Sequence, residues 1–215
     1  MNQDSRYPSR VFAVVPAAGR SRRMGSAKQW LDVGGRTMLQ AVLTPLADAR
    51  VEGIAVVTHS AIAGETVGTL PGGAFIAIND DPDSGMIDSI RIGLSAWSRH
   101  ASVVDRDGFL VCPADQPGIA TADFDACIDA FLAAPGRIVI ATWNDRMGHP
   151  VVFPASLLDV VRSAACDAGL NALPRAHPAL VLPVACRSPA VTRDVDTPED
   201  YHKLLGGCDD RCDLV

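Results

Sequence analysis

The sequence predicts an α/β fold in which helices flank both faces of a mostly parallel sheet. Short apolar runs typical of buried strands recur along the chain, and amphipathic helical patterns lie between them. No repeat or low-complexity linker interrupts this alternation. With 215 residues, 48% of them hydrophobic and 20% charged, the chain can bury one sizeable core. We expect a single domain over residues 11–205, a flexible segment at residues 1–10 and a polar tail at residues 206–215.

The first strand is expected at Val11–Pro16, an uninterrupted apolar run. The later strand runs are Ile54–Thr58, Ala74–Ile78, Gly108–Cys112, Arg137–Thr142, Pro150–Phe153 and Leu180–Val184. Helical patterns are expected at Thr37–Ala49, Ser84–Ser98, Ala122–Leu132 and Ser156–Ala165. Thr197 as N-cap and Pro198 at the first helical position open a last helix. Because ligands of such sheets bind beyond the carboxyl ends of the strands, the segments after the first and fourth strands are the first candidates for a site.

Charge and composition argue against several classes of protein. The net charge of −6 disfavours an extended nucleic-acid-binding face, although a local basic cluster can still hold a small anion. The sequence has no apolar run long enough to cross a membrane, and its polar N-terminus lacks the hydrophobic stretch of a secretory signal. We therefore expect no membrane partner and a cytoplasmic location. The six cysteines lack zinc-type spacing, so we expect reduced thiols, with Cys208 and Cys212 incidental.

The loop after the first strand has the composition of a phosphate-binding segment. It contains Ala17, Ala18, Gly19, Arg20, Ser21, Arg22 and Arg23 and continues to Lys28. Small residues allow a ligand to approach the backbone closely, and guanidinium groups match the geometry of phosphate oxygens. Lys28 is one of only two lysines in the chain. The alternative is an arginine-rich turn that is merely solvated.

Two acidic segments are candidate sites for a cation. Asp115 follows the fourth strand in the run Pro113–Pro117, where a carboxylate can hold Mg²⁺ together with water and phosphate oxygens. Asp194 and Asp196 alternate along an extended segment, so they are expected to point the same way. The alternatives are a turn aspartate for Asp115 and a helix-capping role for the second pair.

These segments together resemble the molybdenum cofactor nucleotidyltransferases, within the wider sugar-phosphate nucleotidyltransferase superfamily. The loop reads A-A-G-x-S-x-R-M-G followed by lysine, the fourth strand is followed by Asp-Gln-Pro, and the chain reads D-x-D-T-P-E-D from Asp194. The resemblance implies a Rossmann-like sheet of the nucleotidyltransferase type and a triphosphate-binding loop. It also implies that Arg23 and Lys28 bind the phosphates, and that Mg²⁺ is held by Asp115 and either Asp196, which we favour, or Asp194.

The middle of the chain resembles the same family less specifically. Residues 79–94 resemble its nucleobase and ribose segment, which implies nucleotide contacts from Asn79, Ser84, Gly85, Ser89 and also Pro113; Ser84 is alternatively only an N-cap. The acceptor is expected to contact Gln116 and the G-H-P element formed by Gly148, His149 and Pro150. Residues 166–171 depart from the family's G-D-x-G-A-R segment, which puts the acceptor's identity in doubt. Arg175 lies nearby and is the candidate to replace the missing arginine.

The resemblance also implies a reaction. Cytosine-specific members of the family carry P-A-A-G where guanine-specific members carry L-A-G-G, and this chain has Pro16-Ala17-Ala18-Gly19. The expected activity is transfer of CMP from CTP to the terminal phosphate of Mo-molybdopterin, with release of pyrophosphate and a molybdenum hydroxylase as client. Two alternatives remain: a cytidylyltransferase acting on methylerythritol phosphate, and a non-catalytic carrier of molybdenum cofactor.

Overall fold

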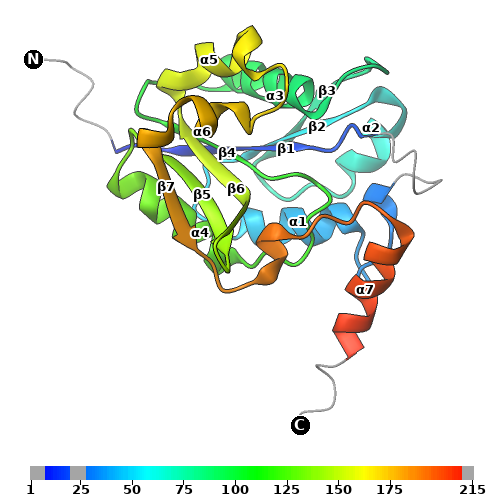
Figure 1. The fold of residues 1–215 in the computed structure, drawn as a ribbon. Helices are drawn as coiled ribbons and strands as arrows, with labels where there is room; N and C mark the ends of the chain where they lie inside the picture. The colour runs from blue at the N-terminus through cyan, green and yellow to red at the C-terminus, as the bar shows by residue number, and fades with distance from the viewer. Residues whose placement is uncertain (1–7, 20–27, 210–215) are drawn as a thin grey trace, which may run out of the picture.

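The computed structural model describes residues 8–19 and 28–209, and its centre is a seven-stranded sheet (Figure 1). The strands are β1 (Val11–Pro16), β2 (Ile54–Thr58), β3 (Ala74–Ile78), β4 (Gly108–Val111), β5 (Ile138–Trp143), β6 (Arg146–Pro154) and β7 (Val181–Ala185). They lie in the order β3-β2-β1-β4-β6-β5-β7. Only β6 is antiparallel to its neighbours, so the predicted mostly parallel α/β fold is confirmed.

Helices cover both faces of the sheet. They are α1 (Met38–Ala47), α2 (Ser60–Val67), α3 (Met86–His100), α4 (Thr121–Ala133), α5 (Leu158–Arg162), α6 (Ala172–Ala176) and α7 (Pro198–Asp209). Figure 1 shows α1 and α4 on one side of the sheet and α3, α5 and α6 on the other. Within the described ranges no helix is long and apolar enough to span a membrane.

The side chains of β1 alternate between two hydrophobic cores because successive residues of a strand face opposite sides of the sheet. Val11, Ala13 and Val15 pack in the core formed with α1 and α4. Phe12 and Val14 pack in the core formed with α3, α5 and α6. The strand is therefore apolar throughout, as expected for a parallel strand covered on both faces.

The structure differs from the sequence expectations in both halves of the chain. The strand expected at Pro150–Phe153 is β6, which is longer and forms a hairpin with β5. The helix expected at Ser156–Ala165 is split into two 3₁₀ turns, Ala155–Leu157 and Ala164–Cys166, with the short α5 between them. Helix α2 was not predicted, since it has one buried residue and little amphipathic pattern. The expected flexible segment and polar tail lie largely outside the described residues.

The topology brings two loops together at one edge of the sheet. Strands β1 and β4 are parallel neighbours, and beyond them Ala114 N donates to Pro16 O at 3.2 Å. The segments that follow these strands therefore start side by side. This is the edge at which ligands of open α/β sheets bind.

Candidate active site

A cavity of about 460 Å³ opens at the carboxyl ends of β1, β2, β3 and β4. Ten of the residues singled out in the sequence line it: Ala17, Ala18, Gly19, Lys28, Asn79, Ser84, Gly85, Ser89, Asp115 and Asp196. They come from five separate parts of the sequence. We call this space the first cavity.

The backbone after β1 is held in place by one buried side chain. Gln29 follows Lys28 in the 3₁₀ turn Lys28–Trp30 and is only 2% exposed. Its Nε2 donates to Ala17 O at 2.6 Å and to Gly19 O at 3.0 Å. These bonds tie the two ends of the loop to each other. Arg20, Ser21, Arg22 and Arg23 lie between them, outside the described residues.

Lys28 joins the two acidic segments electrostatically. Its Nζ lies 2.5 Å from Asp115 Oδ2 and 3.0 Å from Asp196 Oδ1. Burial disfavours the charged ammonium, but Asp115 and then Asp196 outweigh that cost, so the pKa of Lys28 lies above its ordinary value. The group is therefore a permanent positive charge near neutral pH.

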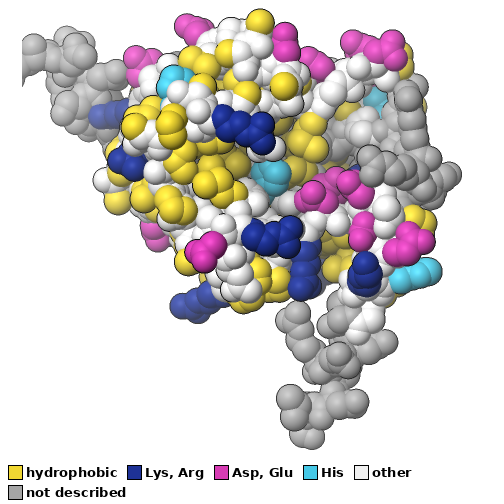
Figure 2. Space-filling view, in the orientation of Figure 1, with side chains coloured by type: hydrophobic (Ala, Val, Ile, Leu, Met, Phe, Trp, Pro, Cys, Tyr) yellow, Lys and Arg dark blue, Asp and Glu magenta, His cyan; other side chains and the backbone are white. Residues whose placement is uncertain are grey.

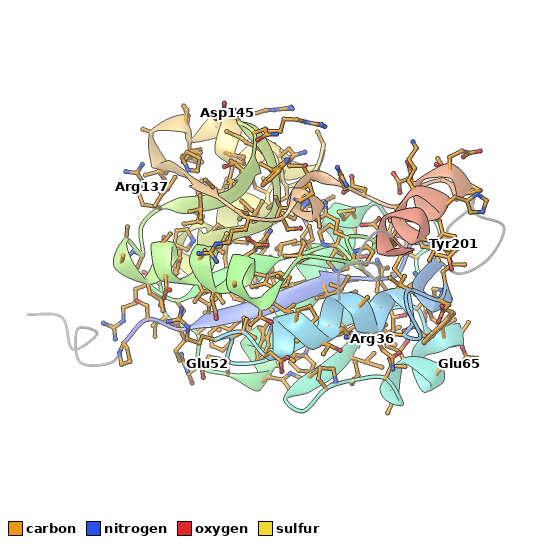
Figure 3. All side chains as sticks on the ribbon, turned by 90° about the horizontal axis from the view of Figure 1, so that it is seen from below. Arg36, Glu52, Glu65, Arg137, Asp145 and Tyr201 are labelled. Carbon is orange, nitrogen blue, oxygen red and sulfur yellow. The ribbon has the colours of Figure 1, made fainter. Side chains whose placement is uncertain are left out.

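The segment that carries Asp196 is fixed at both ends. Val195 N donates to Asp115 O at 2.9 Å, which ties it to the loop after β4. Thr197 caps α7 as predicted, because its Oγ1 accepts from Asp200 N at 3.2 Å and its N–H donates back to Asp200 Oδ2 at 3.1 Å. Tyr201, labelled in Figure 3, anchors α7 by donating from its hydroxyl to Asp32 O at 2.5 Å.

A buried polar network borders the first cavity at the end of β3. Asn79 and Ser89 are each 4% exposed. Asn79 Nδ2 donates to Ser84 Oγ at 3.0 Å and to Ser89 Oγ at 2.8 Å. The three side chains thus fix the turn before α3, and Asp88 Oδ2 accepts from Gly85 N at the start of that helix. Ser84 is not the cap of α3, since Gly85 holds that position.

The donor set around Asp115 suits a hard divalent cation. Asp115 Oδ1 is buried and accepts no hydrogen bond from any described residue. The carboxylate of Asp196 lies close by, because it contacts the same Lys28 Nζ as Asp115 does. No group of three or more His, Cys, Asp or Glu side chains gathers as a metal site in residues 8–19 and 28–209. Two carboxylates still fit Mg²⁺, which commonly takes its remaining ligands from substrate phosphates and water.

A second, larger cavity of about 730 Å³ lies beside β6 and α6. Gln116, Gly148, His149 and Asp194 line it, together with Arg146 and Arg175. Figure 2 shows a hollow with a largely hydrophobic floor and basic side chains at its rim, on the face that carries β6 and α6. The second cavity therefore combines apolar surface with positive charge, which suits an anionic organic ligand.

Two polar side chains of the second cavity are left with open hydrogen-bonding atoms. Gln116 Nε2 donates to Asp194 Oδ1, while Gln116 Oε1 is buried without a partner among the described residues. His149 Nδ1 is likewise buried without a described partner. Burial lowers the pKa of His149, and the charges of Asp194 and Asp115 offset only part of that shift. The imidazole is therefore neutral at pH 7.

Gly148 is required for packing, whereas its predicted contact with the acceptor stays a prediction. A Cβ at this position would lie 1.8 Å from Val191 O, so β6 approaches the 3₁₀ turn Pro189–Thr192 too closely for any other residue.

The two hydrogen-bonded segments, residues 115–116 and residues 194–196, each contribute side chains to both cavities. Asp115 and Asp196 line the first cavity, and their near neighbours Gln116 and Asp194 line the second.

Some residues were missed by sequence reasoning, and two predicted ones lie apart from the cavities. His59, Asp81, Asp83 and Met86 also line the first cavity; Asp81 and Asp83 could have been suspected because they follow β3. Pro113 and Pro150 are buried and are not among the residues lining either cavity, so their direct ligand contacts stay predictions.

Residues 13–181 match the family described as the MobA-like NTP transferase domain. Nicotine blue oxidoreductase of Paenarthrobacter nicotinovorans is 31% identical over 205 residues, which cover 91% of this chain and 96% of that protein. The 2-C-methyl-D-erythritol 4-phosphate cytidylyltransferase of Xanthomonas euvesicatoria pv. vesicatoria is 32% identical over 158 residues, 64% of this chain. That match spans 55% of the cytidylyltransferase.

Solved structures agree with the family match. Rv0371c from Mycobacterium tuberculosis H37Rv is 27% identical and superposes with a TM-score of 0.79, covering 93% of this chain and 99% of that one. A structure of the same protein in complex with manganese gives a TM-score of 0.74 at 25% identity, covering 93% and 100% of the two chains. Since the family match spans most of the sequence, the chain belongs to the MobA-like NTP transferase domain family and is an enzyme of the nucleotidyltransferase type.

Proposed function

We propose that the protein transfers CMP from CTP to the terminal phosphate of Mo-molybdopterin and releases pyrophosphate. One observation carries the proposal: Lys28 lies between Asp115 and Asp196 in the first cavity, and the near neighbours of these carboxylates, Gln116 and Asp194, line the second cavity. An ammonium group, placed together with two carboxylates that fit a divalent cation, can stabilise the negative charge that shifts between phosphate oxygens when one phosphate attacks another. The acceptor phosphate is itself the nucleophile, so the reaction needs no strong general base.

In this reaction the bond between the α-phosphorus and its bridging oxygen to the β-phosphate breaks. An oxygen of the acceptor phosphate forms the new bond to the α-phosphorus, and the bridging electrons leave with pyrophosphate. Asp115 and Asp196 would hold Mg²⁺, which supplies Lewis-acid charge neutralisation when bound. Lys28, and Arg23 from the loop after β1, would bind the phosphates and stabilise the negative charge that grows on the leaving group.

The second cavity is the proposed acceptor site. Gln116 Oε1 and His149 Nδ1 offer hydrogen-bonding atoms that no described residue uses. Arg146 and Arg175 line the same space and suit the negative charges of the acceptor. Arg175 comes from α6, just after the segment that departs from the family pattern, and so it would take over the phosphate contact of the missing arginine. A molybdenum hydroxylase would receive the product.

The proposed preference for CTP rests on Ala18. This residue lines the first cavity, and its methyl group narrows the space available to a base compared with glycine. A pyrimidine needs less room than a purine. Replacing Pro16 and Ala18 by Leu and Gly is expected to relax the preference for CTP over GTP. Unchanged selectivity in the double variant would remove these residues from the argument.

The direct test measures pyrophosphate release by the purified chain with Mg²⁺. CTP and GTP are each offered with Mo-molybdopterin or with 2-C-methylerythritol 4-phosphate. Release only with CTP and Mo-molybdopterin is the expected result. Because one relative is named for nicotine blue, turnover of that compound is followed in parallel. Turnover of nicotine blue without pyrophosphate release in any combination would overturn the proposal.

A second candidate function is cytidylyl transfer to methylerythritol phosphate. The match to a cytidylyltransferase of that type includes 158 aligned residues, which favours it. Against it, Asp115 is followed by Gln116 and Pro117, whereas that family carries D-x-x-R-P, and no lysine lies near Asp196 in the sequence. Pyrophosphate release with the sugar phosphate alone would make this function correct. If neither acceptor is turned over, CTP binding would point to a different acceptor, and absence of CTP binding would favour a non-catalytic carrier, which needs no triphosphate site.

A further inference from the structure

Three oxygen atoms converge on the ammonium group of Lys28. Asp115 Oδ2 lies at 2.5 Å, Asp196 Oδ1 at 3.0 Å and Val195 O at 3.4 Å from Nζ. The side chains of Lys28 and Asp115 are only 15% and 13% exposed, so little water screens the contact between these two groups, whereas the Asp196 side chain is 45% exposed. Carboxylate and carbonyl oxygens are also the ligands that a hard divalent cation selects. The ammonium thus occupies the position to which such a cation would be drawn.

The ammonium and a divalent cation cannot share this position. Mg²⁺ binds its oxygen ligands at about 2.0–2.1 Å, so an ion bridging Asp115 and Asp196 would take the space now filled by Nζ. Two like charges at such a separation in a poorly screened site also repel each other strongly. The ammonium of Lys28 must therefore move away before a divalent cation can bind between the carboxylates.

We propose that Lys28 is the resident counter-ion of the metal site and leaves it when the nucleotide arrives. The inference rests on the proposed function only in taking Asp115 and Asp196 as the metal ligands. In the free protein Lys28 offsets one of the two negative charges of these carboxylates and keeps metal affinity low. When a nucleotide binds, its phosphates accept the ammonium, and the carboxylates become available to the metal.

The local structure permits this exchange without moving the backbone. Gln29 fixes the adjoining turn through its bonds to Ala17 O and Gly19 O, and Leu31 N donates to Lys28 O at 3.2 Å. The lysine stem has four flexible carbons, so a rotamer change is enough to move the charge. Lys28 already lines the first cavity, where the phosphates are expected.

The proposal makes metal and nucleotide binding interdependent. Displacing Lys28 costs free energy when metal binds alone, and a nucleotide removes that cost. By linkage, each ligand must then raise the affinity for the other by the same factor. This coupling comes in addition to the affinity that metal and triphosphate have for each other in water.

The test measures Mn²⁺ affinity of the full chain from the electron paramagnetic resonance signal of free Mn²⁺, with and without CTP. Lys28→Met removes the charge and keeps the length of the side chain, and Lys28→Gln keeps a hydrogen-bond donor. Lys203→Met is the matched control, because Lys203 is the other lysine and its side chain is 80% exposed on α7. Circular dichroism checks that each variant is folded.

Without CTP, both Lys28 variants are expected to bind Mn²⁺ at least about tenfold more tightly than the wild type, and the control to match the wild type. The increase in Mn²⁺ affinity caused by CTP should be smaller in the Lys28 variants. Folded variants that bind Mn²⁺ no more tightly than the wild type would overturn the proposal.

A measurement on the wild type needs no substitution at Lys28. Labelling with [¹³Cε]lysine gives two lysine resonances, since the chain has two lysines. Lys203→Met identifies which belongs to Lys28. Titration with Mg²⁺ alone is expected to move that resonance in step with metal binding. A resonance that stays in place at saturating Mg²⁺ would refute displacement, whether or not the protein transfers CMP. Conversely, failure to transfer CMP would leave these metal measurements unaffected.

Discussion

At the scale of single residues, one cation holds together two segments that are far apart in the chain. Lys28 contacts Asp115 and Asp196, and all three had been singled out from the sequence. Their place at one site was expected from the resemblance of their segments to the nucleotidyltransferases, and for Asp115 also because a residue that closely follows a buried parallel strand lies at the ligand-binding edge of the sheet. Gln29 could not be anticipated, since its role depends on backbone carbonyls that only the folded loop presents. Arg146 reaches the second cavity only through the β5–β6 hairpin.

Removing either charge at the centre of the site should slow the reaction strongly. Lys28→Ala and Asp115→Ala are each expected to lower the rate of CMP transfer by about 10²–10³, the usual effect of removing one transition-state contact. Pyrophosphate release at saturating CTP measures this. Lys203→Ala serves as control, because that lysine is exposed on α7. Near-normal turnover in either variant would remove its residue from the mechanism.

Removing the charge of Asp194 and removing the charge of Asp196 should change the kinetics of the enzyme in different ways. Asp196 contacts Lys28 in the first cavity, so Asp196→Asn is expected to lower kcat and weaken Mn²⁺ binding. Asp194 accepts from Gln116 in the second cavity, so Asp194→Asn should mainly raise KM for the acceptor. The two variants are compared by steady-state kinetics with each substrate varied. Indistinguishable profiles would contradict the division between the cavities.

His149 should make the fold less stable in mild acid. Burial lowers its pKa in the folded state below the ordinary value of 6.5. Above that value both states are neutral and His149 contributes no pH dependence. As the pH falls through the unfolded-state pKa, the unfolded chain binds the proton more readily, and the free energy of unfolding decreases. Denaturant unfolding should therefore show that the free energy of unfolding decreases less between pH 7 and pH 5 for His149→Gln than for the wild type. An equal loss in both proteins would assign the effect to other groups.

At the scale of elements, the β5–β6 hairpin decides how the second half of the molecule differs from the first. Residues Asn144 and Asp145 form its two-residue turn, with φ of 47° and 62°. Both values lie in the left-handed region that the tightest hairpin turns require. The apolar runs of the neighbouring strands were recognised, but the pair Asn-Asp was not read as a turn. That signal would have predicted the antiparallel strand.

Glycine at position 145 should stabilise the hairpin. Asp145→Gly removes the steric cost of the left-handed conformation, and we expect the free energy of unfolding to rise by about 0.5–1 kcal/mol. Urea unfolding monitored by circular dichroism measures the change. Asp145→Ala is the matched control and should destabilise the protein, because alanine keeps the Cβ but lacks the local hydrogen bonding of aspartate. Figure 3 shows Asp145 on the outside of the molecule, far from the labelled Tyr201 of α7.

The helices were predicted best where one face packs against the sheet. Helices α1, α3 and α4 bury regularly spaced apolar residues, and their spans were close to those expected. The segment after β6 was predicted as one helix but has three short pieces. Ser163 explains the break, because its Oγ accepts from Ala165 N and so stops α5. A side chain that competes with the helix backbone in this way is visible in sequence only once the end of the helix is known.

At the scale of the whole molecule, ligand binding should be tied to global stability. If CTP and Mn²⁺ bind only the folded state, ligand at about 100 times its Kd adds about 2.7 kcal/mol to the free energy of unfolding. For a domain of this size that corresponds to a rise of about 5–11 °C in Tm. Thermal unfolding with CTP, GTP or no nucleotide tests this, with Asp115→Asn as the variant that should lose most of the rise. An equal rise with GTP would contradict selectivity for CTP.

The position of Asp196 in the chain has a consequence for protein synthesis. All seven strands precede it, and the family match at residues 13–181 ends before it. A ribosome that has made the chain as far as β7 has therefore supplied the sheet, Lys28 and Asp115, but not the second carboxylate. Until residues 194–196 pair with the loop after β4, the contact between Lys28 and Asp196 cannot form. The order of translation thus delays completion of the proposed metal site until the rest of the domain has been made.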